Sequence, residues 1–140
     1  MEARLQKQIN YQNSIGVIMA IRRDFYEIQG DDVFFEWVVK DEDGPIDLTG
    51  SAVWITLKRK LSQPDDEAAL QLVWGDIAGA IGQITDPEEG LHEFHLPSIE
   101  TKNLDGKYFY DIQWRNAEGL IHTPFIGTID FTDERTKDKE

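Results

Sequence analysis

Bulky apolar residues alternate with polar ones through much of this sequence, and this two-residue rhythm constrains the fold more than any other feature. In residues 33–40 the apolar positions of one face are Val33, Phe35, Trp37 and Val39. Because side chains of a β-strand point alternately to opposite faces, the segment is predicted to be a half-buried strand. The same period predicts strands at 52–59 and 106–114. Their expected inward-facing residues are Val53, Ile55, Leu57, Tyr108, Tyr110, Ile112 and Trp114.

Turn-forming sequences separate these segments. Residues 41–45 read Asp-Glu-Asp-Gly-Pro, in which Asp bonds its own backbone, Gly accepts a positive φ and Pro ends a ladder. Further short strands are expected at 70–74, 80–85, 91–96 and 120–131, and Pro124 indicates an edge or a bulge in the last. One helical turn is expected within 97–105. Since no long amphipathic helix interrupts the pattern, it predicts an all-β antiparallel sandwich or barrel of about seven to nine short strands.

Composition narrows the possible functions. The 140 residues are enough for one domain, and the absence of cysteine excludes a disulfide scaffold, a thiolate nucleophile and a Cys-ligated metal. Twenty-seven acidic residues stand against fourteen basic ones, giving a net charge of −13. Such a field disfavours nucleic acid and anionic membranes as partners. It is typical of a soluble protein, or of one that docks to a basic partner.

The N-terminal residues differ from the rest. Residues 1–20 are expected to form an arm that contacts other subunits, residues 21–132 the β-sandwich, and residues 133–140 a charged, flexible tail. The start lacks the apolar core of a secretory signal, and no segment is long enough to span a membrane. An apolar run, residues 15–21, joins the arm to the sandwich, and its length suits a strand. The candidate interface residues are Ile15, Val17, Ile18, Met19 and Ile21 of this run, with Trp54 and Trp74.

Two interpretations of the tryptophans stay open. Packing in the core is favoured, because the alternating pattern places aromatic side chains on inward faces. In the other, Trp54 or Trp74 lies outside, where an aromatic ring anchors a protein interface or stacks on a sugar.

No metal site is predicted. Asp41, Asp43 and Asp47 suggest calcium, but an EF-hand loop needs a Glu where this chain has Ala52. An acidic turn is the better interpretation. His92 and His95 are three residues apart on one expected strand, so they point to opposite faces and do not share a zinc ion.

No catalytic or cofactor-binding residues are predicted either, and the chain is not expected to be an enzyme. The glycines at 75, 79 and 82 are not followed by the Lys-Ser/Thr of a phosphate loop. None of the serines lies in a nucleophile-elbow sequence. Acidic residues are so abundant that neighbouring carboxylates are expected by chance.

Four segments, taken together and in this order, resemble a known family. They are residues 28–33 (Ile-Gln-Gly-Asp-Asp-Val), 43–51 (Asp-Gly-Pro-Ile-Asp-Leu-Thr-Gly-Ser), 104–113 (Leu-Asp-Gly-Lys-Tyr-Phe-Tyr-Asp-Ile-Gln) and 127–132 (Gly-Thr-Ile-Asp-Phe-Thr). The order is similar to that in the immunoglobulin-like N-terminal domain of tailed-phage baseplate upper proteins and in related small phage tail proteins. The resemblance spans residues 24–132.

This resemblance implies an immunoglobulin-like sandwich with a structural role in a virion tail or baseplate. The family supplies no catalytic residues to transfer. Compared with that family, no receptor-binding region is expected after the domain, and an extra N-terminal arm is expected before it. A connector or adaptor that binds other virion proteins, and copies of itself, is therefore expected. Its expected location is the virion, after synthesis in the host cytoplasm. The alternatives are a neck or capsid-decoration protein and a carbohydrate-binding module.

Overall fold

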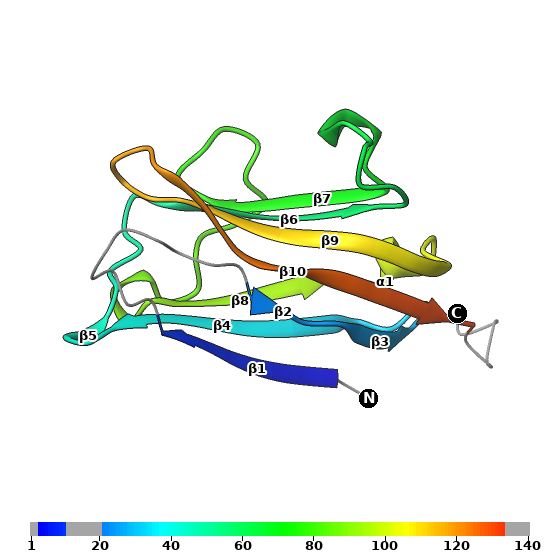
Figure 1. Ribbon diagram of the computed structural model, residues 1–140, viewed down its shortest axis with the longest axis horizontal. Helices are drawn as coiled ribbons and strands as arrows, with labels where there is room; N and C mark the ends of the chain where they lie inside the picture. Colours follow the sequence, from blue (N-terminus) through cyan, green and yellow to red (C-terminus); the bar gives the residue numbers. More distant parts are fainter. Residues whose placement is uncertain (1–2, 11–20, 134–140) are drawn as a thin grey trace.

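Two β-sheets pack face to face in the computed structural model, which describes the backbone of residues 3–10 and residues 21–133 in full (Figure 1). Sheet A contains β1 (Ala3–Asn10), β4 (Val33–Asp41), β5 (Gly44–Pro45) and β8 (Leu91–Leu96). Sheet B contains β2 (Ile21–Arg22), β3 (Phe25–Ile28), β6 (Ala52–Lys58), β7 (Leu70–Gly75), β9 (Gly106–Arg115) and β10 (Ile121–Thr132). The short helices are η1 (Asp65–Glu67), η2 (Pro87–Glu89) and α1 (Ser98–Thr101). The all-β sandwich predicted from the sequence is confirmed.

Sheet B follows the order β10-β9-β6-β7 with antiparallel pairing, and β2 and β3 lie parallel to β10. In sheet A, β4 pairs with β8 and β5 in antiparallel fashion and with β1 in parallel. The β10-β9-β6-β7 order corresponds to the G-F-C-C′ order of variable-type immunoglobulin sheets. The immunoglobulin-like designation itself stays a prediction.

The predicted inward faces are confirmed. On β4 the buried and half-buried residues alternate from Val33 to Lys40, and β9 alternates in the same way from Tyr108 to Arg115. The inward residues Val53, Ile55 and Leu57 of β6 are also buried. Each of the ten strands of the described residues lies in one of the two sheets, so these alternating faces meet in one interior.

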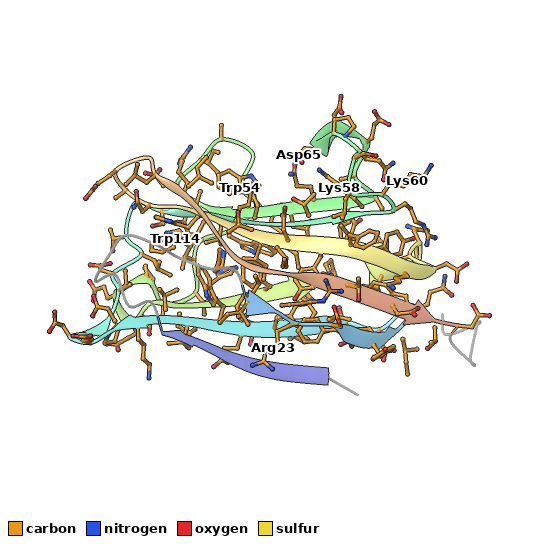
Figure 2. The ribbon with its side chains drawn as sticks, in the orientation of Figure 1. Arg23, Trp54, Lys58, Lys60, Asp65 and Trp114 are labelled. Atoms are coloured by element: carbon orange, nitrogen blue, oxygen red, sulfur yellow. The ribbon has the colours of Figure 1, made fainter. Side chains whose placement is uncertain are left out.

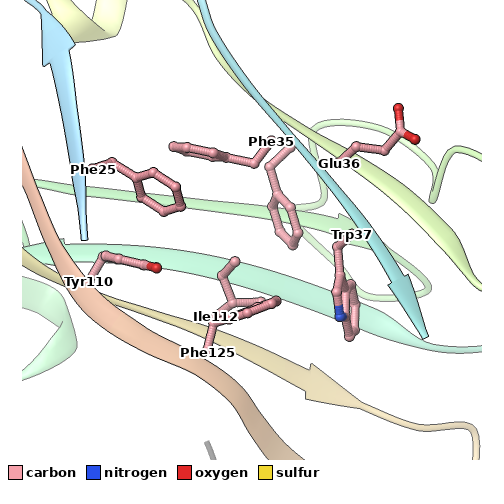
Figure 3. Close-up of a pocket in the computed structure, with 8 residues that line it drawn as sticks. Phe25, Phe35, Glu36, Trp37, Tyr110, Ile112 and Phe125 are labelled. Atoms are coloured by element: carbon pink, nitrogen blue, oxygen red, sulfur yellow. The ribbon is translucent and has the colours of Figure 1, made fainter. Parts of the chain in front are cut away.

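The interior is mainly aromatic, with Phe25, Phe35, Trp37, Tyr110 and Phe125 converging between the sheets (Figure 3). The centroids of the Phe25 and Phe35 rings are 4.7 Å apart, and those of Trp37 and Trp114 are 6.0 Å apart. The gap that these side chains leave has a volume of about 10 Å³. A space of that size accommodates at most a water molecule, so it is a packing gap and not a ligand site.

Several connections match the sequence-based predictions. Asp41 and Asp47 accept bonds from the backbone N–H groups two residues on, as expected for acidic turns. The helical turn expected within 97–105 is α1. The register of β9 and β10 shifts between His122 and Phe125, which places the predicted bulge at Pro124.

The strand predicted at 80–85 is wrong. Residues 76–86 form turns and bends instead, with one isolated bridge between Asp86 and Leu91. In this segment Ile84 is buried but Ile81 is 58% exposed, so no continuous alternating face exists to pack on the sandwich. The short strands β2, β3 and β5 lie in segments where no strand was predicted, apart from Ile21 of β2.

The expected N-terminal arm is represented among the described residues by β1, which pairs with β4 of its own chain. The register runs from Ala3 opposite Val33 to Asn10 opposite Lys40. Figure 1 shows β1 as the outermost strand beside β4. The expected contact of this segment with another subunit stays a prediction.

Candidate functional site

Sheet B has one broad outward surface, called here the outer face of sheet B. It is formed by the outward side chains of β2, β3, β6, β7, β9 and β10. Its strands contribute four basic residues, Arg22, Lys58, Lys107 and Arg115, and two acidic ones, Asp111 and Asp130, and two acidic residues of the adjoining loops, Asp24 and Asp65, pair with Arg22 and Lys58. The whole chain has the opposite balance, with 27 acidic and 14 basic residues. This face is therefore the less acidic side of a strongly acidic molecule.

Exposed apolar side chains gather on the same face and at its margin. Five of the eight large apolar residues that are exposed in the described chain lie on β3, on β10 or directly before β10. They are Tyr26 (79% exposed), Ile28 (47%), Leu120 (55%), Ile121 (62%) and Ile126 (40%). Ile126 pairs with Arg22, and Tyr26 pairs with Asp130, so apolar and charged groups alternate across these strands. These residues are spread along the length of β10, from its start to the end that pairs with β3, and exposed apolar residues set among charged ones are typical of interaction surfaces.

A partly buried charge cluster lies on the β6–β9 side of this face. Lys58 Nζ is 2.8 Å from Asp65 Oδ1, and Figure 2 shows the two side chains near the β6–β7 loop. Burial raises the pKa of Asp111, an effect that Lys58 opposes and Asp65 reinforces. Beside them, Gln71 Nε2 donates a 3.0 Å bond to Thr56 Oγ1, and Thr56 is only 4% exposed although it points outward. These bonds hold the β6–β7 half of the face in one conformation.

Trp54 and Trp74 lie on opposite faces of sheet B. Trp54 is half-buried on the outer face, where the Arg115 guanidinium lies 5.8 Å from its ring centroid. Trp74 is 7% exposed and packs edge-on against Phe94, with 5.3 Å between ring centroids. Trp74 therefore belongs to the core, and its assignment as a surface interface residue is wrong.

The predicted interface residues Ile15, Val17, Ile18 and Met19 lie outside the described residues. Ile21 begins β2 opposite Phe125 and packs, half-buried, against the core. Whether these residues contact a partner stays a prediction.

The edge where β2 and β3 lie along β10 is fixed by side-chain contacts. Asp24 Oδ1 accepts bonds from the backbone N–H and the hydroxyl of Thr128, at 2.9 and 3.1 Å. Burial raises the pKa of Asp24, but the bonds from Thr128 and the Arg22 guanidinium outweigh it and leave the pKa lowered. Tyr110 donates a 2.8 Å bond from its hydroxyl to the carbonyl oxygen of Arg23. A Cβ at Gly127 would overlap that same carbonyl oxygen, so the close approach of the strands requires glycine.

The two histidines of β8 point to opposite faces, as predicted. His92 is 1% exposed, and burial lowers its pKa to about 3. Its Nδ1 accepts a bond from the Thr85 N–H at 3.3 Å, which makes it a neutral core residue. His95 lies outside, stacked on Phe34 and 2.9 Å from Asp32 Oδ1. Residues 21–133 contain no group of three or more potential metal ligands.

A depression of about 340 Å³ opens at the end of the sandwich that carries the β5–β6 and β7–β8 loops. Its main-chain groups bond to one another, with the Asp76 N–H donating to Ser51 and the Leu48 N–H to Pro87, both to carbonyl oxygens. Beneath it, Trp114 Nε1 donates a 3.0 Å bond to Ser51 Oγ. These bonds hold the loops that form the depression.

Comparison with known proteins shows a similarity in structure. No family model and no curated protein matches the chain. Among solved structures, it is similar to the N-terminal domain of phage TP901-1 ORF48. The two are 12% identical, the match covers 96% of this chain and 100% of that one, and the TM-score is 0.45.

Sequence reasoning did not find Tyr26, Ile28 or Ile126. Tyr26 and Ile28 alternate with the buried Phe25 and Glu27, but four residues are too short a segment to distinguish a strand from a loop. Their exposure also depends on parallel pairing with β10, about a hundred residues later in the chain. In the sequence itself, the only signal was the Phe-Tyr-Glu-Ile alternation.

Proposed function

We propose that this chain is a structural protein of a phage virion, a tail or baseplate component that works by docking to other virion proteins. The observation that carries the proposal is the outer face of sheet B, which combines exposed apolar residues with balanced charges on an acidic molecule. A surface of this kind buries apolar area on association, while its charges select an oriented partner. The kind of assembly, a phage tail or baseplate, is inferred from the sequence resemblance to phage tail proteins.

The segments that carry the resemblance occupy architectural positions. Leu48 is fully buried, and the Asp47 carboxylate accepts bonds from both the N–H and the hydroxyl of Thr49. Tyr108 and Tyr110 are in the core. The Asp105 N–H donates to the Tyr108 hydroxyl at 3.0 Å, a link like the tyrosine corner of immunoglobulin sandwiches. These motifs therefore support a shared framework, and the docking specificity must lie in surface residues outside them.

Incorporation into particles tests the proposal. Particles are purified from cells that make the chain with Tyr26→Ser and Ile126→Ser, and the chain is quantified by mass spectrometry. We expect a folded protein whose incorporation falls at least tenfold. The matched control, Ile81→Ser with Ile99→Ser, removes apolar residues of comparable exposure elsewhere and should leave incorporation unchanged. Normal incorporation of the first variant, or absence of the unmodified chain from particles, contradicts the proposal.

Separated heads and tails distinguish the alternatives within a virion. Our proposal predicts the chain in the tail fraction, whereas a neck or capsid-decoration protein would follow the heads.

A carbohydrate-binding module is the second candidate, and the half-buried Trp54 on an open face is the observation that favours it. Arg115 already lies over that ring, so a stacking sugar would compete with the guanidinium. A glycan screen separates the candidates, because saturable binding that Trp54→Ala abolishes would favour the module. The docking proposal predicts no such binding.

No helix among the described residues has the length and apolar character needed to cross a membrane.

A further inference from the structure

β4 has a different neighbour on each of its two sides. On one side lie β8 and β5, since the Val39 N–H donates to the carbonyl oxygen of Gly90 and the Ile46 N–H donates to that of Val39. On the other side lies β1, in parallel register along residues 33–40. Without β1, this second side would be an open sheet edge at least eight residues long.

Successive residues of β4 direct their main-chain groups to alternate sides of the strand, and this alternation determines which groups face β1. Val39 directs both its N–H and its C=O toward the β8 side, so the groups of Phe34, Glu36, Val38 and Lys40 point toward β1. An open edge of this kind captures a strand from any chain that supplies one. In this structure the edge pairs with a parallel strand, and the local geometry is the same whether that strand comes from its own chain or from a neighbour.

The connection of β1 to the domain permits such a neighbour. β1 ends at Asn10 in sheet A, and the next strand, β2, begins at Ile21 in sheet B. The ten intervening residues, 11–20, span up to about 33–36 Å when fully extended. A connection of that reach permits β1 to pair either with its own domain or with an adjoining one.

We propose that β1 is an exchangeable strand that binds the β4 edge of a second copy of this chain when copies are held close together. The inference rests on the proposed structural role and names one of its partners. Because exchange replaces each β1–β4 contact with an identical one, its cost is small. Pairing of β1 with β4 of its own chain is favoured by an effective concentration on the order of millimolar. Exchange between copies is therefore expected when the protein concentration reaches that value or when copies are held together in an assembly.

Engineered cysteines test the exchange directly, because the chain contains none of its own. Gln8 and Val38 are register partners across β1 and β4, so Gln8→Cys with Val38→Cys places two thiols on adjacent strands. Paired strands lie about 4.8 Å apart, within the range that a disulfide bridges. The protein is unfolded, refolded at micromolar and at millimolar concentration, oxidised and run on a non-reducing gel.

Exchange predicts intramolecular links at micromolar concentration and covalent dimers or larger species that increase at least tenfold at millimolar concentration. The matched control is Thr56→Cys with Gln71→Cys, a β6–β7 pair whose native side chains are bonded at 3.0 Å, and it should remain monomeric throughout. Monomers alone from the Gln8/Val38 variant, unreacted thiols in it, or equal dimers in both variants would each overturn the inference.

The Gln8/Val38 variant is tested as the purified chain, and it leaves the outer face of sheet B unaltered. Failure of exchange is therefore distinguishable from failure of the proposed docking function, which the Tyr26→Ser and Ile126→Ser variant tests.

Discussion

Each sheet receives an N-terminal segment in parallel along one of its strands, but the two segments differ in length and in how they are connected to the rest of the domain. β3 follows β10 over four residues and is fixed by side chains, with Phe25 in the core and Asp24 bonded to Thr128. β1 follows β4 over eight residues, and residues 11–20 separate it from β2, whereas only two residues separate β2 from β3. A strand on a short connection stays in its own domain, whereas a strand on a longer connection can pair with the edge of another copy.

The difference separates a permanent edge from an exchangeable one. The permanent edge positions Tyr26 and Ile28 on the outer face of sheet B, where we propose that other virion proteins dock. The exchangeable edge offers a route from one copy to the next. Variants that remove buried or bonded groups at the β3 edge should therefore lower stability, whereas variants of β1 should change the pairing between copies.

The largest effect is expected from Phe25→Ala on β3. Its ring is buried, with centroids 4.7 Å from that of Phe35 and 5.8 Å from that of Tyr110. Removing a buried phenyl ring typically costs about 3–5 kcal/mol, because contacts are lost and a cavity remains. Urea denaturation followed by tryptophan fluorescence measures the change. A loss below about 1 kcal/mol would show that β3 is not locked to the core.

A pH-dependent effect is expected next, on the side of β4 opposite β1. The pKa of His92 is lowered to about 3 by burial, whereas an unfolded histidine titrates near 6.5. The unfolded chain therefore takes up a proton first on acidification, and stability that is fully present above pH 6.5 is lost as the pH falls toward 3. The slope approaches about 1.4 kcal/mol per pH unit in the middle of this window.

His92→Phe should remove that slope while keeping an aromatic side chain against Trp74 and Phe94. The measurement is urea denaturation of both proteins at pH 7, 6, 5 and 4.5. Asp32, whose pKa is lowered by hydrogen bonds from His95 and from the Ser98 N–H, loses its contribution mainly below this range. Asp111 has a raised pKa and acts with the opposite sign, equally in both proteins. Parallel pH profiles of the two proteins would refute a buried neutral His92.

Gly127→Ala tests how closely β10 approaches the segment between β2 and β3. The added methyl group would meet the carbonyl oxygen of Arg23, so one of the two backbones has to move. Overpacking of this kind costs about 1–3 kcal/mol. Ala substitution of Gly119, where a Cβ meets nothing within 4 Å but φ is +88°, provides a control for backbone strain without a clash. The account requires the larger loss at Gly127, measured by thermal unfolding.

Tyr110→Phe should give the smallest of these effects. The substitution removes only the hydroxyl that bonds to Arg23 and keeps the ring in the core. The expected loss is about 1 kcal/mol, typical of one hydrogen bond, and it should leave oligomeric state and particle incorporation unchanged. A strong defect in incorporation without a loss of stability would place Tyr110 in a binding role instead.

The sequence predicted the interior better than the edges and surfaces. Alternation over seven or more residues identified β4, β6 and β9, because a buried face imposes a period of two on long strands. The strand predicted at 80–85 was wrong. Two isoleucines near a turn resemble a short strand in sequence, but one of them is exposed. Pairing of β1 with β4 and of β3 with β10 joins distant segments in parallel, and no local pattern specifies such partners.

The candidate site was predictable only in part. Trp54 was identified as a possible surface aromatic and does lie on the outer face of sheet B. Trp74 was indistinguishable from it in sequence, although it points into the core, because the face of a strand depends on which neighbours cover it. The charge balance of the outer face was also not visible, since its basic residues come from three strands, β2, β6 and β9, that are distant from one another in the sequence.

Native-state hydrogen exchange tests most directly the claim that one edge is permanent and the other exchangeable. The account predicts that amides of β1, and those of Phe34, Glu36 and Val38 facing it, exchange through local opening at a free energy well below that of global unfolding. Amides of β3 and β10 that bond to each other should exchange only with global unfolding. Equal protection of β1 and β3 would contradict the account.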